Sequence, residues 1–252
     1  MHVKSAELIP VILATDTSSR RLGLTLARGS EPIASLTCSR FEPHSKTFFD
    51  HLAAILSLSH LSIEEVDLLA AVTGPGSFTG LRVGLAALKG LASTLGKPLM
   101  GVNLLDLLAI DPGLAGAILV VTEAGRHEIF CGLRRVSPSG LVETEGIDQY
   151  GPPSEALRQV LRNDPPRTLL ITGNAARHYR RDLEELAGEW GSRCTFEPII
   201  DPRAHHWQVL PERGETTLLL ARYAEQLFLS GSLPECHPYY IRPSDAELNW
   251  EK

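Results

Sequence analysis

Apolar residues in the first half of the chain form short runs separated by polar turns. The run at residues 8–14 is continuously apolar, which indicates a central strand covered on both faces. In residues 46–58 the apolar side chains recur at helical spacing, with Phe48, Leu52 and Ile55 on one stripe and Phe49 beside it. The pattern predicts, in order, strands at 8–14, 22–27 and 33–38, a helix at 46–58, a strand at 68–72 and a helix at 81–95. This order indicates an α/β unit.

The second half repeats this order loosely. Strands are expected at 117–122 and 128–133 across a turn at 124–127, and another at 168–172; helices are expected at 152–161, 175–187 and 217–229. A turn-forming run, Asp111-Pro112-Gly113, marks the break between the halves. We therefore expect an N-terminal lobe over residues 1–110, a C-terminal lobe over 111–233 and an extended tail over 234–252.

A glycine-rich turn, Thr-Gly-Pro-Gly-Ser-Phe-Thr-Gly-Leu-Arg at residues 73–82, joins an expected strand to an expected helix. Backbone N–H groups in such a turn can gather around an anion. A P-loop requires Lys-Ser/Thr where Leu81-Arg82 stand, and a dinucleotide fingerprint requires Gly or Ala in place of Thr79. Both an anion site and a tight structural turn remain open.

Composition narrows the class of protein. The chain has 252 residues, 43% of them hydrophobic, which is enough for one large domain or two small lobes. Its net charge of −6 argues against a chain that wraps nucleic acid by itself, although a local basic patch is compatible with it. Four scattered cysteines indicate reduced thiols, and no run of 18 apolar residues is present. We expect a soluble, cytoplasmic protein that crosses no membrane.

The string from Gly74 to Arg82, with Gly84, resembles the signature of the TsaB (YeaZ) family, which consists of non-catalytic partners in bacterial threonylcarbamoyladenosine tRNA modification. Similar segments are Ile-Leu-Ala-Thr-Asp-Thr-Ser at 12–18, Gly-Val-Asn at 101–103 and Pro-Tyr-Tyr-Ile-Arg-Pro at 238–243. The resemblance covers both ends and most of the first half, whereas residues 135–215 match only in layout.

The resemblance implies a two-lobed actin-like ATPase (ASKHA) fold, with a mixed sheet flanked by helices in each lobe. It also implies that the chain binds and activates the catalytic subunit TsaD, and that the ATPase TsaE and tRNA join the assembled pair. A homodimer is an alternative state of the chain alone. No intrinsic cofactor is implied, because ATP, ADP or metal would enter through the partner subunits. Two enzyme alternatives remain: a metallopeptidase of the glycoprotease group and a small-molecule kinase with the same fold.

Asp16 follows the first strand, where actin-like kinases place the acid that organises Mg²⁺ and phosphates. It is either such an acid or a turn residue that satisfies local N–H groups. With Gly74, Gly76 and Ser77 it forms a possible vestigial anion loop. In TsaD, two histidines one helical turn apart bind the catalytic metal, and here the corresponding residues are Leu104 and Leu108. Leucine offers a metal no lone pair, so we expect no metal site and no catalytic residue.

Other polar candidates have ordinary explanations. His205-His206 are adjacent, so their side chains point apart, and a loop is expected there. Cys236-His237 are neighbours, which rarely align as nucleophile and base. In the family pattern Asp-Ala-Arg, Glu123 replaces Asp and Gly125 replaces Arg, with Arg126 one position later; His127 is expected on the hairpin surface.

The helix at 81–95 is apolar nearly all round and contains two interior glycines, each of which costs about 1 kcal/mol relative to alanine. This cost indicates close approach by a neighbouring element, either within the lobe or from a second chain. We expect a helix-pair interface with a partner. Its predicted residues are Phe48, Phe49, Leu52, Leu81, Gly84, Leu85 and Leu88.

Overall fold

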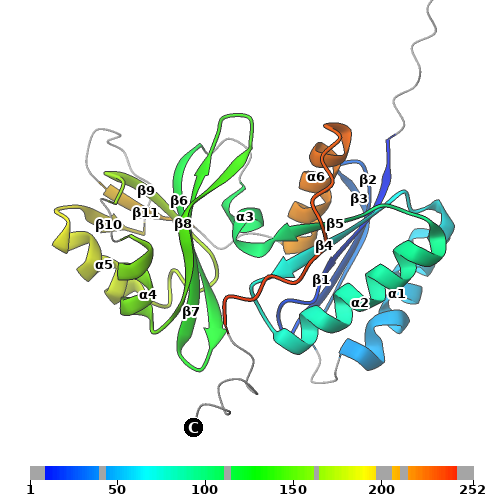
Figure 1. The fold of residues 1–252 in the computed structure, drawn as a ribbon, viewed down its shortest axis with the longest axis horizontal. Helices are drawn as coiled ribbons and strands as arrows, with labels where there is room; N and C mark the ends of the chain where they lie inside the picture. The colour runs from blue at the N-terminus through cyan, green and yellow to red at the C-terminus, as the bar shows by residue number, and fades with distance from the viewer. Residues whose placement is uncertain are drawn as a thin grey trace, which may run out of the picture. The chain divides into compact units, whose positions relative to one another are not determined.

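The fold is taken from a computed structural model, which describes residues 9–39, 44–110, 115–161, 165–196, 206–210 and 215–242 (Figure 1), with the side chains of 44–46 excepted. The chain divides into two compact units. The first contains residues 1–103 and 215–239, and the second contains 104–214 and 240–252. No helix in the described ranges is both long and apolar enough to span a membrane.

The sheet of the first unit has five strands in the order β3-β2-β1-β4-β5. Its first three strands form an antiparallel meander, and the last two run parallel to β1. The bounds are β1 (Val11–Asp16), β2 (Leu22–Arg28), β3 (Glu31–Cys38), β4 (Leu68–Gly74) and β5 (Leu99–Asn103). All seven residues of β4 are buried, as expected of a central parallel strand.

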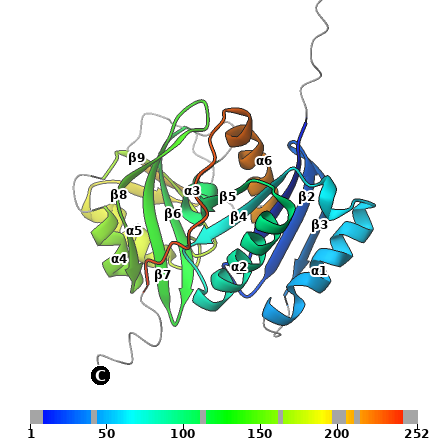
Figure 2. The same cartoon turned by 45° about the vertical axis from the view of Figure 1, so that its right-hand side comes forward.

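Helices cover both faces of this sheet (Figure 2). On one face lie α1 (His44–Ser59) and α2 (Phe78–Leu95), whose buried residues pack with Leu13 and Leu69 of the strands. On the other face α6 (Thr216–Leu229) packs along β1 and β2. A short 3-10 turn, η1 (Ile63–Glu65), leads into β4.

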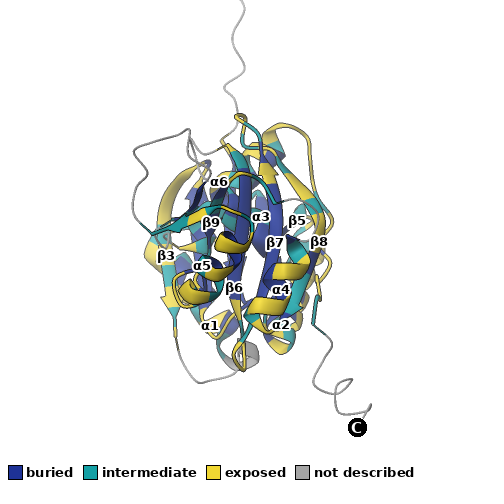
Figure 3. Ribbon diagram, turned by 90° about the vertical axis from the view of Figure 1, so that its left-hand side faces the viewer, coloured by how far each residue is buried: buried dark blue, intermediate teal, exposed yellow. Residues whose placement is uncertain are grey.

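The second unit repeats the plan with six strands in the order β10-β11-β9-β6-β7-β8. The strands are β6 (Gly116–Gly125), β7 (Glu128–Val136), β8 (Val142–Gly151), β9 (Thr168–Thr172), β10 (Arg193–Thr195) and β11 (His206–Val209). One face packs on α4 (Pro153–Val160) and α5 (Arg180–Glu189), whose outer sides are exposed in Figure 3. The other face packs on α3 (Leu104–Ala109). The predicted α/β fold, with a mixed sheet flanked by helices in each of two units, is thus confirmed.

The division of the chain differs from the predicted lobes at 1–110, 111–233 and 234–252. The helix expected at 217–229 was placed in the C-terminal lobe, but α6 belongs to the first unit because Leu220, Ala221 and Ala224 are buried on its sheet. Residues 234–239 also belong to the first unit, since the Gly101 N–H donates to the Pro234 carbonyl at 3.0 Å. Sequence periodicity shows that a helix has an apolar face but does not show which sheet covers it.

Three local predictions also need correction. The helix expected at 175–187 begins only at Arg180, after a run of turns. The expected loop at the His206-Trp207 pair is strand β11, and the Trp207 side chain is fully buried in the core; His205 lies outside the described residues. Strands β5 and β8 were not predicted, because β5 is short and β8 is an edge strand rich in Glu, Thr and Gly.

Candidate functional site

The glycine-rich turn connects β4 to α2. Ser77 caps the helix, and its Oγ accepts a hydrogen bond from the Gly80 N–H at 3.2 Å. Gly74 has a φ of 117°, a conformation that favours glycine, and a Cβ there would lie 2.6 Å from the Tyr239 carbonyl oxygen. The turn therefore fits closely against the protein's own backbone.

The turn that follows β1 lies directly against the glycine turn. The Ser77 N–H donates to the Ser18 carbonyl at 2.6 Å, and a Cβ on Gly76 would overlap that same oxygen. The Ser18 N–H in turn donates to Asp16 Oδ1 at 2.8 Å, so the carboxylate closes a local Asx turn. The residues predicted as an anion loop thus lie in adjoining turns. One of the amides that an anion would need already binds a carbonyl oxygen.

Gly84 is explained by a neighbour in its own chain. A Cβ at this position would overlap Thr17 Oγ1 and lie 2.8 Å from Thr17 Cγ2. Helix α2 therefore approaches the turn after β1 at the point where its interior residue is glycine. The glycine at this position is therefore explained by an internal neighbour, and its predicted contact with a partner helix stays a prediction.

The other predicted interface residues are mostly core residues. Only Phe49 is exposed, with 56% of its surface accessible. Four of the remaining apolar residues are buried between the helices and the sheet: Phe48, Leu52, Leu85 and Leu88. Leu81 is also fully buried. The helical stripe identified from the sequence is the face that packs on the sheet, so in the folded unit these side chains are covered by the chain itself.

Helix α3 contains the two leucines that replace the expected metal ligands. Leu104 is buried, and Leu108 is half-buried against a cluster that includes Leu105 and Ala109. Among the residues that the structure describes, no three His, Cys, Asp or Glu side chains come close enough together to hold a metal ion. Apolar packing therefore occupies the positions mapped to the ligands.

A cluster of paired charged side chains joins α3 to β7 and β8, and the sequence pattern did not predict it. Arg134 is fully buried and donates to both carboxylate oxygens of Asp148, at 2.6 and 2.8 Å, while its Nε donates to Asp106. Gly132 makes room for the pair, since a Cβ there would lie 2.6 Å from Arg134 Nη1. Burial raises the pKa of Asp106, although the Arg134 charge opposes this shift. The sequence signal was an arginine directly after the expected strand at 128–133, on a strand that in the structure continues to Val136.

The β6–β7 hairpin ends in a two-residue loop, Arg126-His127, with both side chains exposed. His127 is thus on the hairpin surface, as predicted. A β-bulge between Glu123 and Gly125 shifts the register just before the tip. The family's arginine position is therefore occupied by a bulge glycine, and Arg126 lies at the tip itself.

Cys236 and His237 do not form a dyad. Cys236 is buried in the core of the first unit, and burial raises the pKa of its thiol to about 11. The His237 side chain is exposed and lies 3.0 Å from Glu235 Oε2. A thiol with this pKa stays protonated near pH 7, so it is a poor nucleophile.

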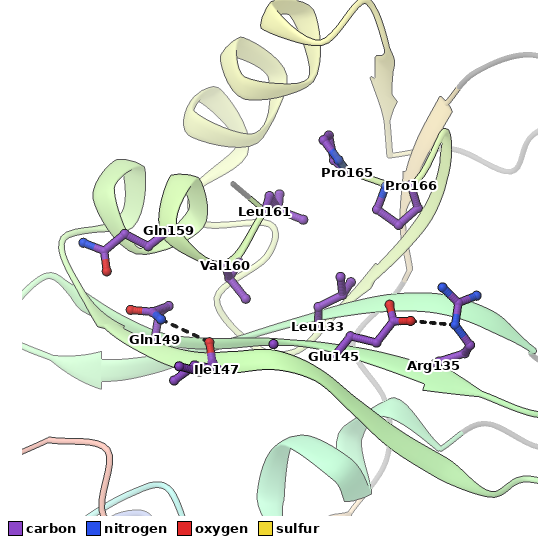
Figure 4. Close-up of a pocket in the computed structure, with 11 residues that line it drawn as sticks. Leu133, Arg135, Glu145, Ile147, Gln149, Gln159, Val160, Leu161, Pro165 and Pro166 are labelled. Carbon is purple, nitrogen blue, oxygen red and sulfur yellow. Dashed lines mark hydrogen bonds and ion pairs between the residues drawn. The ribbon is translucent and has the colours of Figure 1, made fainter. Parts of the chain in front are cut away.

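A pocket of about 520 Å³ lies between β8 and the end of α4 in the second unit (Figure 4). Its walls include Val160, Leu161 and Pro166. The charged groups in the lining, Arg135 and Glu145, pair with each other at 2.6 Å. The pocket offers an apolar surface but no arrangement of a nucleophile with a base, and none of the residues predicted from the sequence lines it.

The chain is similar in sequence to proteins of threonylcarbamoyladenosine tRNA modification. Residues 40–142 match the family model "TsaD: tRNA N6-adenosine threonylcarbamoyltransferase". The chain is 27% identical to the tRNA threonylcarbamoyladenosine biosynthesis protein TsaB of Bacillus subtilis, over 95% of this chain and 97% of that protein.

Two solved structures show the same fold. YeaZ from Pseudomonas aeruginosa superposes with a TM-score of 0.65 and 20% identity, over 92% of this chain and 99% of that chain. A ROK hexokinase from Thermus thermophilus superposes with a TM-score of 0.50 and 11% identity, over 87% and 99% of the two chains. The match to TsaB spans nearly the whole of both chains and YeaZ shares the fold, so these similarities support a protein of the TsaB (YeaZ) family.

Proposed function

We propose that this chain is a non-catalytic subunit required for threonylcarbamoylation of the adenosine next to the anticodon in tRNA. In this proposal it binds and activates a TsaD-like catalytic subunit. Its TsaB relative is named for threonylcarbamoyladenosine biosynthesis, and the matched family model is named for the transferase. A TsaE-like ATPase and tRNA join the assembled pair, and ATP, ADP or metal enters through the partners.

The observation that most favours a non-catalytic role is the hydrogen bond from the Ser77 amide to the Ser18 carbonyl. A kinase with this fold would need that amide for a phosphate, and the carbonyl presents its negative end to the same place. A metallopeptidase would need ligands at two positions where Leu104 is buried and Leu108 packs, half-buried, against an apolar cluster. Neither enzyme alternative is favoured by a specific feature of the described residues.

The exposed side of the α1–α2 pair is the surface proposed for the catalytic subunit. The two helices pack side by side, and their outer positions include Phe49, Ala53, Ala86 and Gly90, all exposed. An aromatic side chain that is 56% exposed beside small residues is a typical anchor for a partner. This α1–α2 surface replaces the buried set predicted from the sequence. The same surface would serve a homodimer when the catalytic subunit is absent.

Reconstitution tests the proposal. The catalytic subunit, threonylcarbamoyl-AMP and tRNA are combined with and without this chain, and modified adenosine is quantified by mass spectrometry. We expect modification to depend on this chain, and we expect the chain alone to modify no tRNA and hydrolyse no ATP. Transfer by the chain alone, or full activity of the catalytic subunit without it, would contradict the proposal.

A further inference from the structure

Three successive residues at the tip of the β6–β7 hairpin have left-handed backbone conformations. Gly125, Arg126 and His127 have φ values of 78°, 54° and 62°. A two-residue hairpin loop with positive φ at both central positions strongly prefers Asn-Gly, because asparagine tolerates the left-handed region better than arginine and glycine has no Cβ to be strained there. Both side chains are exposed, so their burial does not offset this strain. Such strain at an exposed position suggests a role for the side chains themselves.

Side chains from the end of the described chain and from β8 contact the base of this hairpin. Arg242 Nη1 donates to the Ala124 carbonyl at 3.4 Å, and its guanidinium lies 5.7 Å from the centre of the Tyr150 ring. The Tyr150 hydroxyl donates to Glu128 Oε1 at 3.1 Å, and its ring packs against Phe130. The described end of the chain, red in Figure 1, reaches this end of β7. The tip is therefore presented from an ordered base.

A second basic segment lies beside the same end of β6. The Ala175 N–H donates to the Val121 carbonyl at 3.2 Å, and Asn174 Oδ1 accepts hydrogen bonds from the Thr122 hydroxyl and the Glu123 N–H at 2.9 and 3.0 Å. These contacts place the following residues, Arg177 and His178, next to the hairpin strand.

Both side chains of this second segment are exposed. His178 lies 3.7 Å from Glu123, whereas Arg177 forms no ion pair within the described part of the chain. We call the four residues Arg126, His127, Arg177 and His178 the basic end.

We infer that the basic end contacts phosphate groups of the tRNA backbone, an inference that rests on the proposed function in tRNA modification. An arginine guanidinium presents a fork of N–H donors that matches phosphate oxygens. A chain with a net charge of −6 has no overall attraction for RNA, so binding requires local cationic contacts. Two arginines from separate segments, one of them at the tip of a paired hairpin, supply such contacts without reading base identity.

The strained tip allows a test in which stability and RNA affinity change in opposite directions. The double variant Arg126→Asn/His127→Gly installs the preferred turn and removes the charge. We expect its melting temperature to rise by about 2 to 4 °C. We expect its affinity for an unmodified tRNA transcript, measured by fluorescence anisotropy on the chain with and without the catalytic subunit, to fall about two- to fivefold. The slope of log affinity against log salt should fall by about one.

Two further variants keep the test interpretable. Arg177→Gln changes no strained residue and should also reduce tRNA affinity and salt slope, without altering the melting temperature. Arg28→Asn removes the same charge from the exposed end of β2 in the first unit and should leave tRNA affinity unchanged. Wild-type affinity and salt slope in both basic-end variants would overturn the inference, as would equal weakening by Arg28→Asn. Failure of the proposed function would instead appear as modification that does not depend on the wild-type chain.

Discussion

Replacing Gly84 with alanine tests the packing of α2 on the turn after β1. The new Cβ would overlap Thr17 Oγ1, and it would lie 2.8 Å from Thr17 Cγ2 and 3.0 Å from Thr17 Cβ. Alanine stabilises a helix interior by up to about 1 kcal/mol relative to glycine. Overpacking of this kind costs about 1 to 3 kcal/mol, so the clash should outweigh the gain.

Gly90 provides the matched control, because it lies on the same helix and a Cβ there meets no atom within 4 Å. We expect Gly84→Ala to be about 1 to 3 kcal/mol less stable than Gly90→Ala in urea unfolding, with a melting temperature lower by about 2 to 4 °C per kcal/mol. Thr17→Ala should relieve part of the clash, so the double variant Thr17→Ala/Gly84→Ala should show a favourable coupling energy. Equal stability of Gly84→Ala and Gly90→Ala would refute the reasoning and make Gly84 available to a partner.

Three further predictions follow from the described contacts. Phe49→Glu should weaken binding to the catalytic subunit at least about tenfold in calorimetry, whereas Ile147→Glu, at an exposed position on β8, should not weaken it. Equal effects of the two substitutions would show that Phe49 is not part of the binding surface. Arg134→Met leaves the buried Asp148 carboxylate and the partly exposed Asp106 carboxylate without their cation, and it should cost about 3 to 5 kcal/mol in urea unfolding. A loss below about 1 kcal/mol would show that the cluster is not important for stability. The folded-state pKa of Asp106 is raised above 3.8, so the folded state holds a proton more tightly than the unfolded state, and this group's contribution to stability falls as pH rises from 3.8 through the raised pKa. Asp106→Asn should therefore gain stability relative to wild type as pH rises through that window. A stability difference between the two proteins that does not change with pH would contradict this.

The buried strands could be predicted from the sequence because apolar runs record burial directly. Strands β1, β2, β4, β6 and β9 all lie within or beside predicted runs. By contrast, β8 is an edge strand whose polar residues face solvent, so its pattern resembles a loop. The position of α6 was wrong because the unit that a helix joins depends on long-range packing.

The site was predictable only in part. The sequence indicated that glycine at position 84 costs helix stability relative to alanine, and that Leu104 and Leu108 stand at the positions mapped to metal ligands. It did not indicate that Thr17 approaches Gly84 in the fold. The pairing of Arg134 with Asp106 and Asp148 joins three elements, and no local pattern connects them. Contacts between distant segments determine these features, whereas single-sequence patterns record only each segment's own environment.

The central claim is that this chain supplies no chemical group to the reaction, and Asp16→Asn tests it most directly. Asparagine retains an oxygen that can accept the Ser18 N–H but removes the negative charge that a metal-phosphate site would need. The measurement is the rate of tRNA threonylcarbamoylation by the catalytic subunit with a saturating amount of the variant, with complex formation checked in parallel. We predict a rate within about twofold of wild type. Loss of modification with the complex intact would show that the Asp16 carboxylate takes part in the chemistry.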